Sequence, residues 1–252
     1  MGKLVRLQQS TIVFWASLLV FDNFVASPLL DSVKADWLSI LLFKVLELSF
    51  GIIMNALMLK QQIFLTTKLG KNSIVLLTVM AVILLCATVN SHGSLRDSLV
   101  IGSCAAISEE YWFRGVIFGH LLSRLKPNER RVSGIIKCML MTSLLFSLAH
   151  LTNLDSQSLQ LTIVQMIEVF GMSFLFCAAY VRTGNLLIPI CLHFSIDYLG
   201  TMTQNVNHQP TTFLTSALSV ILFLGIYIGL GLVVLEGEEI SKWRLMPHFG
   251  IN

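Results

Sequence analysis

The stretch 108–115, SEEYWFRG, decides how the rest of this sequence is interpreted. It brings together Glu109, Glu110 and Arg114 in an apolar segment that is long enough to cross a bilayer, residues 99–123. A charged side chain at the centre of a membrane helix costs at least about 2.5–3.5 kcal/mol on insertion scales. Three such groups within two helical turns predict that other parts of the chain supply polar partners.

The composition indicates a polytopic membrane protein. Of the 252 residues, 55% are hydrophobic and only 12% are charged, and the mean hydropathy is +0.77. Soluble domains carry about 25% charged residues. Long linkers rich in Gly, Pro or Ser are absent from the sequence and no internal repeat is found, so we expect one all-α membrane domain over residues 1–252.

Eight apolar runs approach the roughly 20 residues that are needed to span a bilayer. They predict helices at about 11–30, 37–59, 74–90, 99–123, 134–151, 160–181, 185–200 and 211–235. All five cysteines fall within these runs and form no CxxC pair. We therefore expect them to be small core residues rather than disulfides or zinc ligands.

The basic residues predict the orientation in the membrane. If the N-terminus is cytoplasmic, thirteen Lys and Arg belong to inside segments, and only Lys34 and Arg96 lie outside. The thirteen are Lys3, Arg6, Lys60, Lys68, Lys71, Arg124, Lys126, Arg130, Arg131, Lys137, Arg182, Lys242 and Arg244. This asymmetry predicts two cytoplasmic termini in a plasma membrane. It also accounts for the net charge of +3, so no nucleic-acid partner is expected.

Charged residues in other runs are expected to form structural pairs. Lys44 and Glu47 are three positions apart, so on a helix they share a face and can pair. Glu168, in the run 160–181, is favoured as a second partner of Lys44, with a place at the functional site as the alternative.

Two later runs carry the candidate partners of the glutamates. Phe146 and His150 occur as FSLAH near the end of the fifth run, and His193 and Asp197 occur as HFSID in the seventh. Residues at i and i+4 share a helix face, so His193 and Asp197 point the same way, as do Glu110 and Arg114. The side chains on the two later runs are expected to face the cavity that holds the glutamates.

The spacing suggests different roles for the two glutamates. Arg114 lies four residues after Glu110 and can hold it as an ion pair, whereas Glu109 is turned by about 100°. Glu109 is then free to share a water with His150, which would supply a general base. His193, with Asp197, could donate hydrogen bonds to an oxyanion.

The depths of these residues set a geometric condition. Counting ~1.5 Å per residue from the cytoplasmic ends places Glu110 about 20 Å deep, His150 about 24 Å and His193 about 12 Å. Convergence therefore requires tilted helices, shifted helix boundaries or a recessed turn at 183–185, and a protein-lined cavity tolerates such a turn.

In this order, the three motifs resemble those of the CAAX prenyl protease and bacteriocin-processing family, called CPBP or Abi proteins. The pattern EExxxR is present as Glu109, Glu110 and Arg114, FxxxH as Phe146 and His150, and HxxxN/D as His193 and Asp197. The resemblance covers about residues 99–200, which would be the catalytic core.

This resemblance implies an intramembrane endopeptidase in which Glu109 and His150 activate water. It assigns His193 and Asp197 to the oxyanion site, and it gives Glu110, Arg114 and Phe146 a supporting role. An ionised Asp197 would repel an oxyanion, so it is expected to be protonated or to orient His193. The glutamate and histidine mechanism requires no cofactor; metal dependence in the family has been argued both ways, so a divalent metal is left open.

Two functional hypotheses follow. The first is a bacterial plasma-membrane peptidase for a peptide or a membrane-associated protein, in bacteriocin maturation or self-immunity; in a eukaryote it would process prenylated C-termini. The second is a catalytically inactive scaffold or immunity protein that binds a peptide or a partner membrane protein. A transporter is disfavoured because inverted repeats are absent from the sequence. The sequence does not indicate the oligomeric state.

Overall fold

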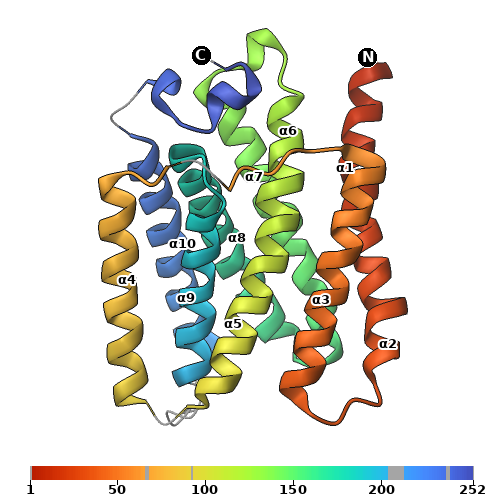
Figure 1. Ribbon diagram of the computed structural model, residues 1–252, viewed down its shortest axis with the longest axis vertical. Coiled ribbons are helices and arrows are strands. Elements are labelled where there is room, and N and C mark those ends of the chain that lie inside the picture. Colours follow the sequence, from red (N-terminus) through yellow and green to blue (C-terminus); the bar gives the residue numbers. More distant parts are fainter. Residues whose placement is uncertain (1, 66–67, 92, 204–212, 237–238, 252) are drawn as a thin grey trace.

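The computed structural model is an all-α bundle (Figure 1) and describes residues 2–65, 68–91, 93–203, 213–236 and 239–251. Its long helices are α1 Gly2–Phe21, α3 Asp36–Met54, α4 Lys71–Asn90, α5 Leu95–Glu110, α7 Val132–Ala149, α8 Leu159–Thr183, α9 Leu187–Thr203 and α10 Phe213–Leu235. The short helices α2 Ser27–Leu30 and α6 Gly119–Ser123 continue α1 and α5. The eight predicted spans are therefore confirmed as helical runs.

Three π-helical segments interrupt these runs. They cover Asp22–Ala26 between α1 and α2, Asn55–Leu59 after α3, and Tyr111–Phe118 between α5 and α6. Short 3-10 helices cover Pro127–Glu129, His150–Asp155, Ile240–Lys242 and Met246–Phe249. None of these segments has a signal in the sequence pattern. π-helical turns inside α-helices are often found at functional sites, and the third one directly follows the two glutamates.

Six helical runs in the described residues are long and apolar enough to cross a membrane on their own. They are Gln9–Leu30, Asp36–Leu59, Lys71–Asn90, Val132–Asp155, Leu159–Thr183 and Leu218–Leu235. The other two runs of the bundle carry motif residues: α9 has 17 residues, and α5 has 16 before its π-helical continuation. The chain is thus a multi-pass membrane protein, and two of its three motifs lie on the two runs that do not meet this criterion.

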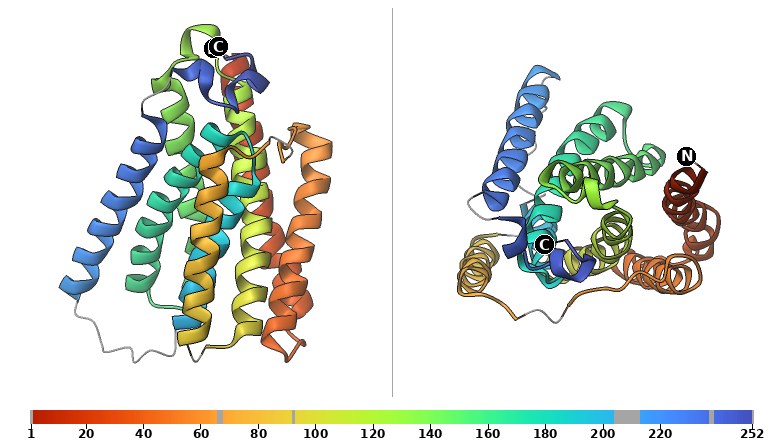
Figure 2. Two further views of the ribbon diagram at one scale, coloured as in Figure 1. Left: turned by 60° about the vertical axis from the view of Figure 1, so that its left-hand side comes forward. Right: turned by 90° about the horizontal axis from the view of Figure 1, so that it is seen from above.

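The N-terminal and C-terminal ends of the chain lie at the same end of the bundle (Figures 1 and 2). The connections from α3 to α4, from α6 to α7 and from α8 to α9 reach this end too, and we call it the N/C face. The connections from α2 to α3 and from α4 to α5 lie at the other end, the opposite face. An even number of spans, as predicted, accounts for this arrangement.

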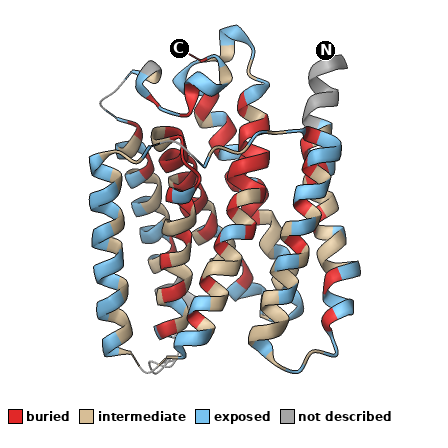
Figure 3. Cartoon of the chain, viewed as in Figure 1, coloured by how far each residue is buried: buried red, intermediate tan, exposed pale blue. Residues whose placement is uncertain are grey.

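The run from α5 to α6 is the centre of the bundle. Residues 112–120 are buried without a break, and Figure 3 shows this stretch in red beside paler neighbours. A helical stretch that is buried on every side is one that other helices surround. In contrast, α4 has no buried residue and most of its residues are exposed, as expected for a helix that faces lipid.

The motif helices are neighbours. Helix α5 packs against α3 and α9, its π-helical continuation packs against α7, and α8 packs against α7, α9 and α10. The motifs at residues 109–114, 146–150 and 193–197 therefore come from helices that share one core.

The contact between α3 and α5 depends on a glycine. A Cβ at Gly51 would lie only 2.4 Å from the indole nitrogen of Trp112. The same nitrogen donates a hydrogen bond to the carbonyl of Glu47 at 3.2 Å, and the Trp112 side chain is fully buried. Gly51 thus lets a large aromatic ring lie directly on the α3 backbone.

Gly51→Ala is expected to lower the free energy of unfolding by about 1–3 kcal/mol, because the added methyl displaces a closely packed ring. Thermal unfolding of the purified protein in detergent measures this effect. Gly225→Ala on α10 is the matched control, since a Cβ there has no atom within 4 Å. Equal unfolding midpoints for the two variants would contradict this account of the α3 to α5 contact.

Candidate active site

A cavity of about 740 Å³ extends from the middle of α5 towards the opposite face. Residues from α1, α3, α5, α7, α8, α9 and the 3-10 helix His150–Asp155 line its wall. The four candidate catalytic residues, Glu109, His150, His193 and Asp197, all belong to this lining. The expected convergence is therefore present in the structure.

A recessed turn allows α9 to take part. Gly184 ends α8 with a φ of 62°, in the left-handed region that glycine tolerates best. Asn185 is buried, and its side-chain oxygen accepts a hydrogen bond from the Leu187 backbone N–H at 2.9 Å. The cap satisfies the first turn of α9 inside the protein. The buried turn meets the geometric condition that the sequence set for His193.

Glu110 is the centre of a buried polar cluster. Its Oε1 lies 2.9 Å from Arg114 Nη1 and 2.8 Å from His193 Nδ1. The side chains of Glu110 and Arg114 are both fully buried. The predicted ion pair is present, and the contact to His193 is one that the sequence analysis missed.

Aromatic rings surround the arginine of this cluster. The guanidinium of Arg114 lies over the rings of Phe146 and Phe176, 4.5 Å and 5.1 Å from their centroids. Such contacts favour a cation that has been removed from water. Phe146 thus supports the site by packing against Arg114.

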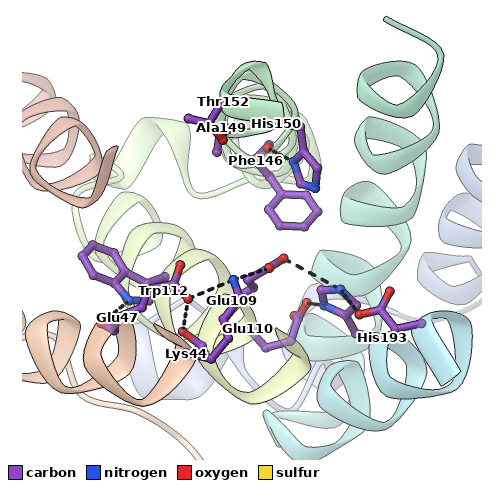
Figure 4. Close-up of polar contacts among 12 residues, drawn as sticks. Lys44, Glu47, Glu109, Glu110, Trp112, Phe146, Ala149, His150, Thr152 and His193 are labelled. Atoms are coloured by element: carbon purple, nitrogen blue, oxygen red, sulfur yellow. Dashed lines mark hydrogen bonds and ion pairs between the residues drawn. The ribbon is translucent and has the colours of Figure 1, made fainter. Parts of the chain in front are cut away.

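His193 connects the two glutamates with Asp197. Its Nε2 lies 3.3 Å from Asp197 Oδ2 and 3.8 Å from Glu109 Oε2 (Figure 4). His193 and Asp197 share a helix face, as their spacing predicted. Both ring nitrogens of His193 therefore face carboxylate oxygens.

His150 lies on the other side of the cavity. Its Nδ1 is 2.9 Å from the carbonyl oxygen of Phe146, one helical turn earlier. Because a carbonyl only accepts hydrogen bonds, Nδ1 carries the proton and Nε2 is the acceptor in the neutral ring. Figure 4 shows His150 across from Glu109 on a different helix, and no direct hydrogen bond joins the two among the described residues.

Lys44 contacts the candidate base directly. Its Nζ lies 2.8 Å from Glu109 Oε1 and 2.9 Å from Glu47 Oε2. The expected pair with Glu47 is present. The contact of Lys44 with Glu109 was not expected, and the water shared by Glu109 and His150 stays a prediction. The pairing of Lys44 with Glu168 was wrong, because Lys44 faces the cavity and Glu168 does not line it.

A second network joins α3 to α5 behind this contact. Ser108 Oγ donates to Glu47 Oε2 at 2.7 Å, and the Glu47 side chain is almost fully buried. Glu47 therefore has partners on both helices. The sequence signal for this network was a lysine and a glutamate three residues apart inside an apolar run.

The residues present do not form an evident metal centre. Among the described residues, no group of three or more His, Cys, Asp or Glu is arranged to hold a metal ion. The ammonium of Lys44 already occupies a position next to Glu109. The charges of the two glutamates are thus balanced by side chains, Lys44 for Glu109 and Arg114 for Glu110.

Comparisons with known proteins concern the segment that carries the motifs. Residues 93–199 match the family model described as type II CAAX prenyl endopeptidase Rce1-like. A stretch of 102 residues is 40% identical to the membrane-embedded CAAX protease MroQ of Staphylococcus aureus (strain USA300), covering 40% of this chain and 36% of that protein. No solved structure matches the chain. The predicted resemblance to CAAX proteases is therefore confirmed for this segment.

Arg114→Met is expected to destabilise the protein by about 3–5 kcal/mol, because it leaves the buried carboxylate of Glu110 without its cation. Adding Glu110→Gln should recover part of the loss, which a double-mutant cycle of unfolding in detergent measures.

Arg96→Met is the matched control for this cycle. Arg96 pairs with Asp97 at 3.0 Å, but its side chain is 63% exposed. Removing an exposed pair changes stability by about 1 kcal/mol or less. An Arg114→Met variant as stable as Arg96→Met would show that the buried cluster does not need its cation.

Proposed function

We propose that this protein is an intramembrane endopeptidase that hydrolyses a peptide or a membrane-associated protein. One observation carries the proposal. The side chains of Glu109, His150 and His193 line one cavity, and Nε2 of His193 lies 3.8 Å from Oε2 of Glu109. The match of residues 93–199 to CAAX proteases supports the same reaction class.

Glu109 and His150 are proposed to activate the attacking water. His150 presents an unprotonated Nε2 once Nδ1 donates to the Phe146 carbonyl, and Glu109 presents a carboxylate from the other wall. A water held between them can lose a proton as its oxygen attacks the scissile carbonyl. The proton then passes to the leaving amine, so the peptide bond is replaced by a carboxylate and an amine.

His193 is proposed to stabilise the oxyanion. Its two nitrogens face Glu110 on one side and Asp197 with Glu109 on the other, and these carboxylates are acceptors when ionised. In a ring protonated at both nitrogens, Nδ1–H donates to Glu110, and the single Nε2–H, which points towards Asp197 in the free protein, can be shared with an oxyanion in the cavity. This geometry favours Asp197 as the group that orients His193.

Lys44 is proposed as a positioning residue. Its ammonium holds Oε1 of Glu109, so that Oε2 remains on the side of His193 and the cavity. A charge-assisted contact of this kind fixes both the rotamer and the ionised form of a carboxylate. Lys44 lies on α3, outside the segment that matches the family.

The proposed location is a bacterial plasma membrane, since the relative named above is staphylococcal. A role in bacteriocin maturation or self-immunity is the biological setting that we propose for the reaction. An inactive scaffold would also retain a cavity, and catalytic substitutions separate the two functions.

Glu109→Gln and His150→Ala should each lower the rate of peptide cleavage by about 10²–10⁴-fold, because each removes a proton acceptor. The measurement is cleavage of a panel of membrane and bacteriocin-precursor peptides by purified protein, followed by mass spectrometry. Glu168→Gln is the matched control, a half-buried glutamate outside the cavity lining. Unchanged cleavage by Glu109→Gln would reject the mechanism, and peptide binding without turnover by the wild type would favour the scaffold.

Lys44→Met should lower kcat by about tenfold or more with little change in KM, since the substrate contacts remain while the base loses its cation. Lys44→Arg should restore most of kcat because it returns the charge. Lys137→Met is the control, because Lys137 is exposed on α7. If Lys44→Arg is as impaired as Lys44→Met while both fold like the wild type, charge at Lys44 is not what Glu109 requires.

A further inference from the structure

The cavity has a deep end and a shallow end. Its deep lining includes Phe113, Met172 and His193, whose exposed fractions are all below 9%. Other lining residues, such as Ser27 and Asp155, are exposed and lie at or near the last turns before the opposite face. Exposure thus increases along the cavity towards the opposite face.

The positions of the reacting residues along their helices also show that the cavity deepens away from the opposite face. Glu109 is fourteen residues from the start of α5 at the opposite face, about 21 Å along the axis. His193 is ten residues from the end of α9, about 15 Å. His150 lies in the first turn after α7 and lines the same cavity as Glu109 and His193. The reacting groups therefore lie at the deep end of the cavity, and its shallow end is at the opposite face.

Between the deep end of the cavity and the N/C face, packed side chains fill the protein. Trp243, Leu245 and Met246 near the C-terminus are almost fully buried, and they belong to one apolar cluster with Phe118 and Tyr180. No residue of the described connections at the N/C face lines the cavity. Substrate has no described route to Glu109 from that side.

The distribution of basic residues indicates which face lies in the cytoplasm. Among described residues, the basic side chains at the N/C face are Lys60, Lys68, Lys71, Arg124, Lys126, Arg130, Arg131, Arg182, Lys242 and Arg244. The opposite face carries Lys34 and Arg96 together with Asp31, Asp36, Asp97 and Asp155. Because basic loops remain in the cytoplasm, the opposite face is the extracytoplasmic one.

We propose that the cavity opens to the extracytoplasmic side and takes a peptide segment presented there. The lining carries five acidic side chains, Asp22, Glu47, Glu109, Asp155 and Asp197, against Lys44 and the doubly protonated ring proposed for His193, so the segment is neutral or basic rather than acidic. The substrate class is thus a peptide that has already crossed or entered the membrane. That the bound peptide is a substrate rests on the proposed function, whereas the side on which the cavity opens does not.

Cysteine accessibility tests the side of opening without any cleavage assay. Met172→Cys, at the deep end, is treated with a small cationic thiosulfonate in intact cells and in inverted vesicles. Asp155→Cys and Lys126→Cys report the two faces, and Val79→Cys on the exposed side of α4 is the lipid-facing control. The wild-type chain, whose five cysteines lie in apolar helices, sets the baseline.

The expected result is that Met172→Cys and Asp155→Cys react at least tenfold faster in intact cells, Lys126→Cys reacts faster in inverted vesicles, and Val79→Cys remains at baseline. Faster reaction of Met172→Cys from the cytoplasmic side would overturn the proposal, as would its remaining at baseline on both sides. If the protein cleaves peptides but Met172→Cys reacts from the cytoplasmic side, the proposed function stands and the side of opening is wrong. If Met172→Cys reacts from the extracytoplasmic side but no peptide is cleaved, the side of opening stands and the proposed function is wrong.

Two peptides test the charge of the segment. An amidated decapeptide of Lys and Leu should slow modification of Met172→Cys several-fold in detergent, where sidedness has no influence. A decapeptide of Glu and Leu should not. Equal protection by both peptides would reject the charge preference and leave the side of opening unaffected.

Discussion

An ionised side chain in an apolar bundle is stable only if opposite charges or hydrogen-bond partners replace the water it has lost. In this protein, that constraint ties together three helices that are far apart in sequence. Arg114 and His193 both contact Oε1 of Glu110, and Lys44 pairs with Glu109 and Glu47. The packing of α3, α5 and α9 can therefore be regarded as the arrangement that leaves none of these charges alone.

Local patterns were enough to predict much of this arrangement. Apolar runs gave the eight helices, because each run is about as long as a bilayer is thick. The i and i+4 spacing gave the pairs Glu110 with Arg114 and His193 with Asp197, since neighbours on a helix face remain neighbours whatever the tertiary structure. The family resemblance supplied the expectation that three motifs meet.

Contacts between distant helices were not predictable in the same way. Lys44 and Glu109 are 65 residues apart, and Glu110 and His193 are 83 apart. Such pairings depend on how each helix is rotated about its axis, which a single sequence does not reveal. The π-helical segment Tyr111–Phe118 changes that rotation just after the glutamates and has no signal in the hydrophobic pattern. The side chains therefore had to be located in three dimensions before Lys44 could be assigned to the site.

The position of Lys44 bears on how this protein can be divided. The segment that matches CAAX proteases begins at residue 93, whereas the counter-ion of its first glutamate comes from α3. A chimera that transplanted only the matched segment would carry a glutamate whose charge balance was left behind in the donor. The smallest transferable unit for engineering is consequently the matched segment together with α3. This unit includes Gly51, the glycine of α3 against which Trp112 packs.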